Sequence, residues 1–115
     1  MADEAFEDLW GRKGGPELVA LQSVFEGQAL VSEEVRQVVG LTMEQLRESL
    51  VAAQRVGLVA VADDRIVFVS IPPASGQRAR LDWCLEAHQK EFVSLKSSLQ
   101  TKFMIRFLSS TIRSN

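Results

Sequence analysis

Side chains able to recognise another molecule are concentrated in residues 42–56, a segment with the apolar spacing of a helix. Its expected outward positions carry hydroxyl, thioether, amide and guanidinium groups, on Thr42, Met43, Gln45, Arg47 and Ser49. Gln and Arg are chemically suited to the edges of adenine and guanine, and a Thr hydroxyl is suited to a phosphate or a base. The segment is therefore a candidate for reading bases in a DNA major groove, although the same residue types are common on any helix that faces solvent.

Two arginines outside this segment, Arg36 and Arg65, are candidates for contacts with DNA phosphates. Acids on the same expected surface oppose such contacts, namely Glu44 and Glu48 in the helix and Asp63 and Asp64 in the turn that follows. Because affinity for DNA comes largely from neutralising phosphates, a second interpretation stays open, in which this surface binds another protein. The acidic balance of the chain, Trp10 and the apolar run at residues 103–108 fit that alternative.

Residues typical of catalysis or metal binding are scarce. The chain has one histidine, His88, and one cysteine, Cys84, which together do not make a Cys/His zinc site. No P-loop, GxGxxG or paired-carboxylate motif occurs, so we expect no enzyme activity and no cofactor. Cys84 is interpreted as a small apolar filler, with a redox-sensing thiol as the alternative. His88 is interpreted as a packed residue, with a pH-sensitive dimer contact as the alternative.

Residues 32–39 are expected to form a helix directly before the candidate reading segment. Ser32 is its expected N-cap, followed by two glutamates that favour the positive end of the helix dipole. Gly40 is expected to end this helix, because glycine adopts a left-handed backbone conformation without steric cost. After a turn at residues 40–41, Thr42 and Gln45 have the spacing of a capping box.

The second helix continues into strands. Its inner face is expected to consist of Leu46, Leu50, Ala53 and Val56, and Gly57 is expected to end it. Residues 58–62 and 65–71 are rich in β-branched side chains and flank Asp63-Asp64, a turn signal. They predict a two-stranded hairpin, to which residues 29–31 add a short third strand.

This order of helix, short turn, helix and hairpin within residues 32–70 resembles the winged helix-turn-helix transcription regulators, in particular the TrmB-like and MarR-like families. At residues 55–59, RVGLV, the sequence is similar to the step from the second helix into the wing in these regulators. The resemblance covers about half of the chain. It implies a DNA-binding regulator of transcription, cytoplasmic and associated with the nucleoid, whose second helix lies in the major groove of double-stranded DNA.

The expected fold class is mainly α, or α+β, in four parts. These are an arm or short helix at residues 1–15, the winged domain at 16–71, a linker at 72–76 and a long helix at 77–115. The arm has an apolar edge formed by Phe6, Leu9 and Trp10, and Trp10 is expected to dock on the core or on a partner. Full-length TrmB-like regulators continue into an effector-binding domain where this sequence ends, so no sugar-sensing function is carried over.

No proline or glycine interrupts residues 77–112, which are expected to form one helix about 50 Å long. Its apolar positions alternate like a coiled-coil seam, at Leu81, Leu85, His88, Phe92, Leu95, Leu99, Phe103 and Phe107. Most of this seam is expected to need a cover beyond the winged domain, and a second copy of the helix is the simplest cover, which predicts a homodimer. Pairing through a long helix is also what the TrmB-like resemblance implies. Trp83 lies off the seam and is expected to pack on the winged domain.

The composition is that of a globular protein, with 46% hydrophobic and 24% charged residues in a chain of 115. Charge is polarised: residues 1–31 contain six acids and two bases, and residues 72–115 contain seven bases and three acids. The basic end either faces a polyanion or is simply a solvated helix. No apolar run approaches the roughly 20 residues that span a bilayer, and the acidic N-terminus is unlike a signal peptide, so an intracellular location without membrane contact is expected.

Overall fold

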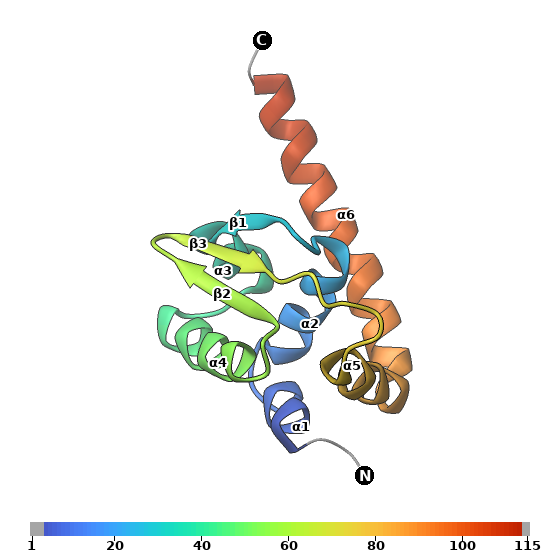
Figure 1. Ribbon diagram of the computed structural model, residues 1–115. Coiled ribbons are helices and arrows are strands. Elements are labelled where there is room, and N and C mark those ends of the chain that lie inside the picture. Colours follow the sequence, from blue (N-terminus) through green and yellow to red (C-terminus); the bar gives the residue numbers. More distant parts are fainter. Residues whose placement is uncertain (1–3, 114–115) are drawn as a thin grey trace.

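The computed structural model describes the backbone of residues 4–113 and the side chains of residues 4–105. Within these residues the chain forms six helices and a small antiparallel sheet, so the fold is mainly helical α+β (Figure 1). The helices are α1 (Glu4–Trp10), α2 (Gly15–Val24), α3 (Ser32–Val39), α4 (Met43–Arg55), α5 (Gly76–Ala87) and α6 (Gln89–Arg113). The strands are β1 (Ala29–Val31), β2 (Val59–Ala62) and β3 (Arg65–Phe68). No helix in this part of the chain has the length and apolar character needed to cross a membrane.

The centre of the molecule is α2, whose few polar residues are not gathered on one face and which packs against α1, α4 and α6. Four successive residues of α2, 18–21, are almost completely buried. A helix without a polar face is stable only when other elements cover it on all sides. Here α4 covers one side of α2, and α1 and α6 cover others. The expected N-terminal arm is therefore a docked short helix, with Phe6, Leu9 and Trp10 all in the core.

The three-stranded sheet has the order β1-β3-β2, with both pairs antiparallel. The hairpin and the third strand predicted from the sequence are both confirmed. Ile66 of β3 lies opposite Leu30 on one side and Val61 on the other, and its side chain is buried. Asp63 in the turn between β2 and β3 has φ 55°, a left-handed conformation that Asp tolerates better than most residues.

The turn between α3 and α4 also follows the prediction. Gly40 has φ 79°, and α4 begins with a reciprocal cap: the Gln45 backbone N–H donates to Thr42 Oγ1 over 3.1 Å, and the Thr42 N–H donates to Gln45 Oε1 over 3.0 Å. The expected N-cap at Ser32 is wrong. Val31 occupies that position, because β1 pairs with β3 as far as Val31 and the Ser32 N–H then donates to the backbone oxygen of Asp64.

The long C-terminal segment is not one helix. It breaks at His88 into α5 and α6, and at the break the His88 side chain contacts Glu7 of α1. The break turns α6 onto α2, and α6 then extends past the body of the molecule (Figure 1). Trp83 is 49% exposed, so the expectation that it packs on the domain is also wrong.

The apolar seam of the segment faces the chain's own core. Leu81 and Leu99 are buried, and the partly buried Leu85, Phe92, Leu95 and Phe103 pack against the same core. The chain's own core therefore covers Leu81 and Leu99 completely and leaves the other four seam residues only half-buried. Phe107 lies outside the residues whose side chains are described.

Candidate functional site

The candidate reading surface is formed by the start of α4 and the β2–β3 hairpin beside it. Thr42, Met43 and Arg47 are exposed, as the helical spacing predicted. Arg47 and Arg65 make no hydrogen bond or ion pair within the described part of the chain, so both guanidinium groups are free to meet an anion. The Thr42 hydroxyl oxygen and the Gln45 side-chain oxygen accept hydrogen bonds in the helix cap, which leaves the Thr42 O–H and the Gln45 amide NH₂ as donors for an outside contact.

Ser49 does not belong to this surface. It is 1% exposed, and its hydroxyl donates to the backbone oxygen of Lys13 over 2.6 Å. The prediction that it faces outward is wrong, because the turn after α1 packs against that side of α4. No periodicity within residues 42–56 reports this contact, since its partner lies 36 residues away.

Arg36 is occupied within the molecule. Its Nε donates to Glu33 over 3.0 Å and its Nη1 donates to the backbone oxygen of Leu41 over 3.0 Å. The hydrogen bond with Glu33 raises the pKa of Arg36, and the bond from Arg36 lowers the pKa of Glu33. Arg36 thus holds the turn between α3 and α4, and the ion pair itself contributes little to stability because water surrounds it.

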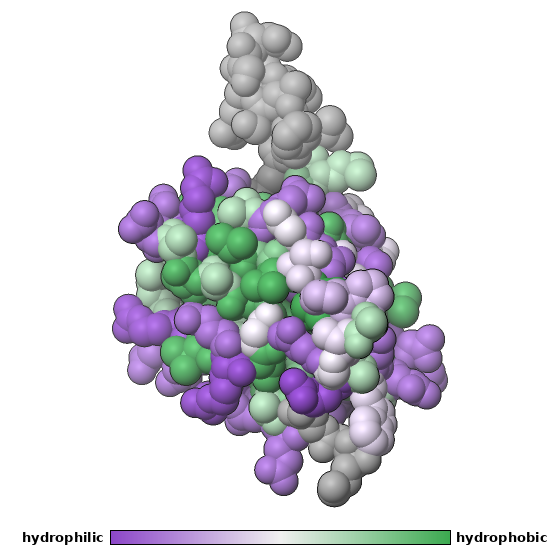
Figure 2. All heavy atoms as spheres, in the orientation of Figure 1, coloured by the Kyte–Doolittle hydropathy of each residue, from purple (hydrophilic) through white to green (hydrophobic). Residues whose placement is uncertain are grey.

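A groove lies between α4 and the hairpin and encloses about 430 Å³. Its apolar lining comes from Met43, Leu46, Leu50, Val51 and Val61, and its acids are Glu33, Asp63 and Asp64. Met43, Val51 and Val61 remain exposed although they are apolar. Figure 2 shows hydrophobic surface gathered over the sheet and bordered by hydrophilic residues. This surface combines an apolar floor with an acidic rim and two free arginines.

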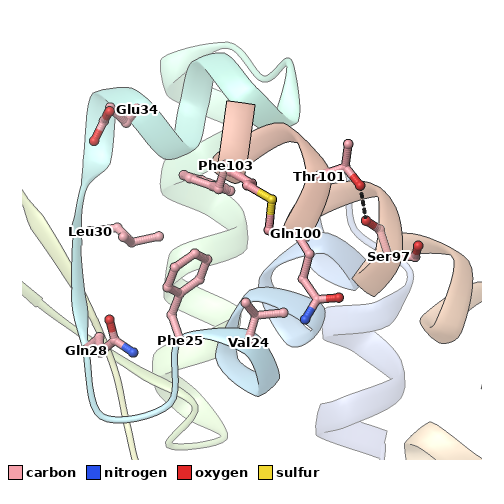
Figure 3. A pocket seen from close by; sticks show the side chains of 10 residues that line it. Val24, Phe25, Gln28, Leu30, Glu34, Ser97, Gln100, Thr101 and Phe103 are labelled. Atoms are coloured by element: carbon pink, nitrogen blue, oxygen red, sulfur yellow. Dashed lines mark hydrogen bonds between the residues drawn. The ribbon is translucent and has the colours of Figure 1, made fainter. Parts of the chain in front are cut away.

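A second, larger pocket of about 830 Å³ lies where the end of α2, β1 and α3 face α6 (Figure 3). Its walls are apolar, and Phe25 and Phe103 meet edge to face with ring centroids 5.2 Å apart. Gln28, Glu34 and Gln100 are the polar side chains at its rim, and the Thr101 hydroxyl donates to the Ser97 oxygen. The pocket exists only because α6 folds back on α2, so the sequence carried no signal for it.

The fold also gathers three metal-ligating side chains that are distant in sequence. His88 Nε2 lies 3.0 and 3.2 Å from the two Glu7 carboxylate oxygens, and Cys84 Sγ belongs to the same cluster, whose donor atoms all lie within 4.8 Å of one another. The Trp10 ring stacks on the His88 ring at a centroid distance of 4.6 Å, and Trp10 Nε1 donates to Glu91. Cys84 is buried, as its predicted place in the core requires. Sequence reasoning missed the cluster because 81 residues separate Glu7 from His88.

Comparison with known proteins adds no further constraint. Neither the protein-family models, nor the curated proteins, nor the solved structures contain a match to this chain.

Proposed function

We propose that this chain is a winged helix-turn-helix regulator of transcription, which binds double-stranded DNA with α4 in the major groove and the β2–β3 hairpin as the wing. The observation that carries the proposal is the unit from α3 to β3. Two helices meet at a three-residue connection with a left-handed Gly40, the second helix has a complete capping box, and a hairpin follows it directly. The N-terminal half of a helix placed in this way is the part that reaches base edges in helix-turn-helix proteins.

The proposed contacts follow from exposure and from the hydrogen bonds already made. Arg47 and the Gln45 amide are assigned to base edges, and Arg65 on the hairpin is assigned to a phosphate. Met43 supplies an apolar contact beside them. Ser49 is excluded from this set because it is buried, and Arg36 is excluded because it already holds the turn.

The regulator is proposed to act as a homodimer in the cytoplasm, with two reading helices that reach successive major grooves about 34 Å apart. Because the chain's own core covers part of the seam, the proposed contact adds other residues of α6. Val93, Met104 and Ile105 are exposed apolar side chains on this helix, which extends beyond the body. An exposed apolar group of this kind is typical of a surface that pairs with another chain.

A titration against DNA at two salt concentrations tests the proposal. The purified chain is titrated with random-sequence duplex at about 50 and 200 mM salt, and its oligomeric state is recorded by sedimentation of the same sample. Binding that weakens steeply with salt is expected, because each neutralised phosphate releases counterions. A chain that does not bind duplex at the lower salt concentration is not a DNA-binding regulator.

Replacing Arg47 by alanine is expected to lower affinity for the preferred DNA sequence about 5- to 150-fold, the cost of one lost bidentate base contact. Arg47→Lys keeps the charge but not the fork of donors, so it is expected to recover non-specific binding without recovering sequence preference. Selection of the preferred duplex from a random pool, followed by fluorescence anisotropy, gives both quantities. Equal affinity of the wild type and Arg47→Ala for that duplex would remove Arg47 from the interface.

The acidic groove favours a second candidate function, a winged-helix subunit that binds another protein through the same surface. An apolar floor with exposed Met43, Val51 and Val61 suits a protein partner better than a phosphate backbone. Asp63 and Asp64 at the hairpin tip would meet phosphates in the DNA complex and basic side chains in a protein complex. The two functions therefore predict opposite effects when these charges are removed.

The double variant Asp63→Asn, Asp64→Asn separates the two candidates. Asn keeps the size of Asp and tolerates the left-handed conformation at position 63. If the hairpin approaches DNA, affinity is expected to rise about 2- to 10-fold at low salt, because two repulsive charges are gone. Asp82→Asn, an exposed position on α5, serves as the matched control with no expected change. Unchanged DNA affinity in the double variant would mean that the hairpin does not act as a wing.

A further inference from the structure

We propose that Glu7, Cys84 and His88 form a binding site for a divalent transition metal of the zinc type, at the place where α1 meets the junction of α5 and α6. This inference does not depend on DNA binding. It rests on the donor chemistry of the three side chains, on their spacing and on the way the fold holds them.

The donor set is a thiol sulfur, an imidazole nitrogen and a carboxylate oxygen. Zn²⁺ accepts all three kinds of ligand, whereas Mg²⁺ and Ca²⁺ prefer oxygen ligands alone. A Cys84 thiolate and a Glu7 carboxylate also balance the two positive charges of the ion, with His88 as a neutral ligand. Charge balance matters here because Cys84 is only 5% exposed, and a buried thiolate is costly without a cation beside it.

The spacing is close to what a tetrahedral ion requires. In a zinc site with ligand bonds of about 2.0–2.3 Å, neighbouring donor atoms lie roughly 3.3–3.6 Å apart. The Glu7 and His88 donors are 3.0 Å apart, and Cys84 Sγ lies within 4.8 Å of both. Cys84 Sγ is therefore at most about 1.2 Å farther from the other donors than in a zinc site, because 4.8 Å exceeds 3.6 Å by that amount.

Helical spacing and the stacked Trp10 ring hold two of the three ligands, Cys84 and His88, in place. Cys84 lies on the last turn of α5 and His88 four residues later at its C-cap, the separation that places two ligands on one face of a helix. Trp10 stacks on the imidazole ring with an angle of 14° between the planes, which restricts the orientation of His88. Glu7 and Trp10 are both on α1, so a metal ion would join α1 to the joint from which α6 departs.

The proposed site is accessible from solvent on one side. Cys84 is buried, whereas Glu7 and His88 are each partly exposed, so an ion can approach from the side of Glu7 and His88. Three protein ligands leave the fourth tetrahedral position to water or to a small ligand. A bound ion would therefore fix the position of α1 against α5 and α6 without burying the ion completely.

Binding is tested on the full chain, reduced and treated with a chelator, by adding Zn²⁺ or Co²⁺. Zinc at about a hundredfold excess over its Kd is expected to raise Tm by roughly 10 °C. Co²⁺ is expected to give the intense visible bands of a tetrahedral ion together with a near-ultraviolet sulfur-to-cobalt charge-transfer band. A wild-type chain whose Tm and spectrum do not respond to either ion overturns the proposal and leaves the cluster as a contact between Glu7 and His88.

Three variants identify the ligands. Glu7→Gln keeps the hydrogen bond to His88 and is expected to weaken zinc binding about 10- to 100-fold. Cys84→Ser keeps the size of the side chain and is expected to abolish the charge-transfer band. Asp8→Asn, an exposed neighbour on α1, is the matched control and is expected to bind zinc as the wild type does. Unchanged zinc affinity in both Glu7→Gln and Cys84→Ser would place the ion elsewhere and overturn the proposal. Glu7→Gln alters no buried residue, so the test remains valid even if Cys84→Ser does not fold.

Discussion

Replacing Gly15 by alanine is expected to destabilise the protein by about 3 kcal/mol or more. Gly15 begins α2 directly beneath the end of α1, and a Cβ atom at this position would overlap the backbone oxygen of Leu9. The obstacle is backbone, which cannot rotate away as a flexible side chain can. The overlap can be removed only if α1 and α2 move apart. Phe6, Leu9 and Trp10 would then lose part of their burial in the core.

Thermal or urea unfolding followed by circular dichroism measures this effect. Gly76→Ala is the matched control: an added Cβ there meets no atom within 4 Å, at the first residue of α5. The control is expected to change stability by less than about 1 kcal/mol. If Gly15→Ala were as stable as Gly76→Ala, α1 would not pack on the start of α2, and the cluster of Glu7 with His88 would lose its structural basis.

Replacing Leu99 by alanine is the second large change, with an expected loss of about 2–5 kcal/mol. Leu99 lies on α6 and is 2% exposed against the chain's own core. Lys90→Ala on the same helix is the matched control, because Lys90 is exposed and its truncation is expected to cost less than about 0.5 kcal/mol. Equilibrium unfolding of the three proteins gives the comparison.

The Leu99 experiment also decides what covers the seam of α6. If the cover is α2 of the same chain, the destabilisation by Leu99→Ala is the same at every protein concentration. If the cover were a second copy, Leu99→Ala would sediment as a monomer while keeping its fold. The first outcome leaves Val93, Met104 and Ile105 as the residues for the proposed dimer contact.

Local signals in the sequence identified the helices, turns and strands between residues 29 and 68, although not the N-cap of α3 or the burial of Ser49. The turn at Gly40, the capping box of Thr42 with Gln45, and the hairpin around Asp63 each depend on residues within a few positions of one another. Apolar spacing likewise identified the buried face of α4, where Leu46, Leu50 and Ala53 lie in the core. Such elements can be read from sequence because their energetics are set by neighbours along the chain.

The same reasoning failed where a distant segment competes with a local pattern. Ser49 has an outward position by spacing alone, but its hydroxyl binds the backbone of Lys13, so the turn after α1 covers it. The pattern of residues 77–112 fits one helix, yet the side chain of His88 binds Glu7 and the helix breaks there. A heptad-like spacing reports that one face is apolar, and it does not say which surface will bury that face.

The sequence by itself determined α3, α4, the short connection between them and the β2–β3 hairpin, because caps, glycine turns and β-branched runs act over a few residues. Only the tertiary structure decided that α6 folds onto α2, that a pocket opens beside Phe25, and that Glu7, Cys84 and His88 meet. These features require α1 and the C-terminal helices to share one core with α2. Whether they pack there depends on the apolar surface buried across the whole chain and not on any local pattern.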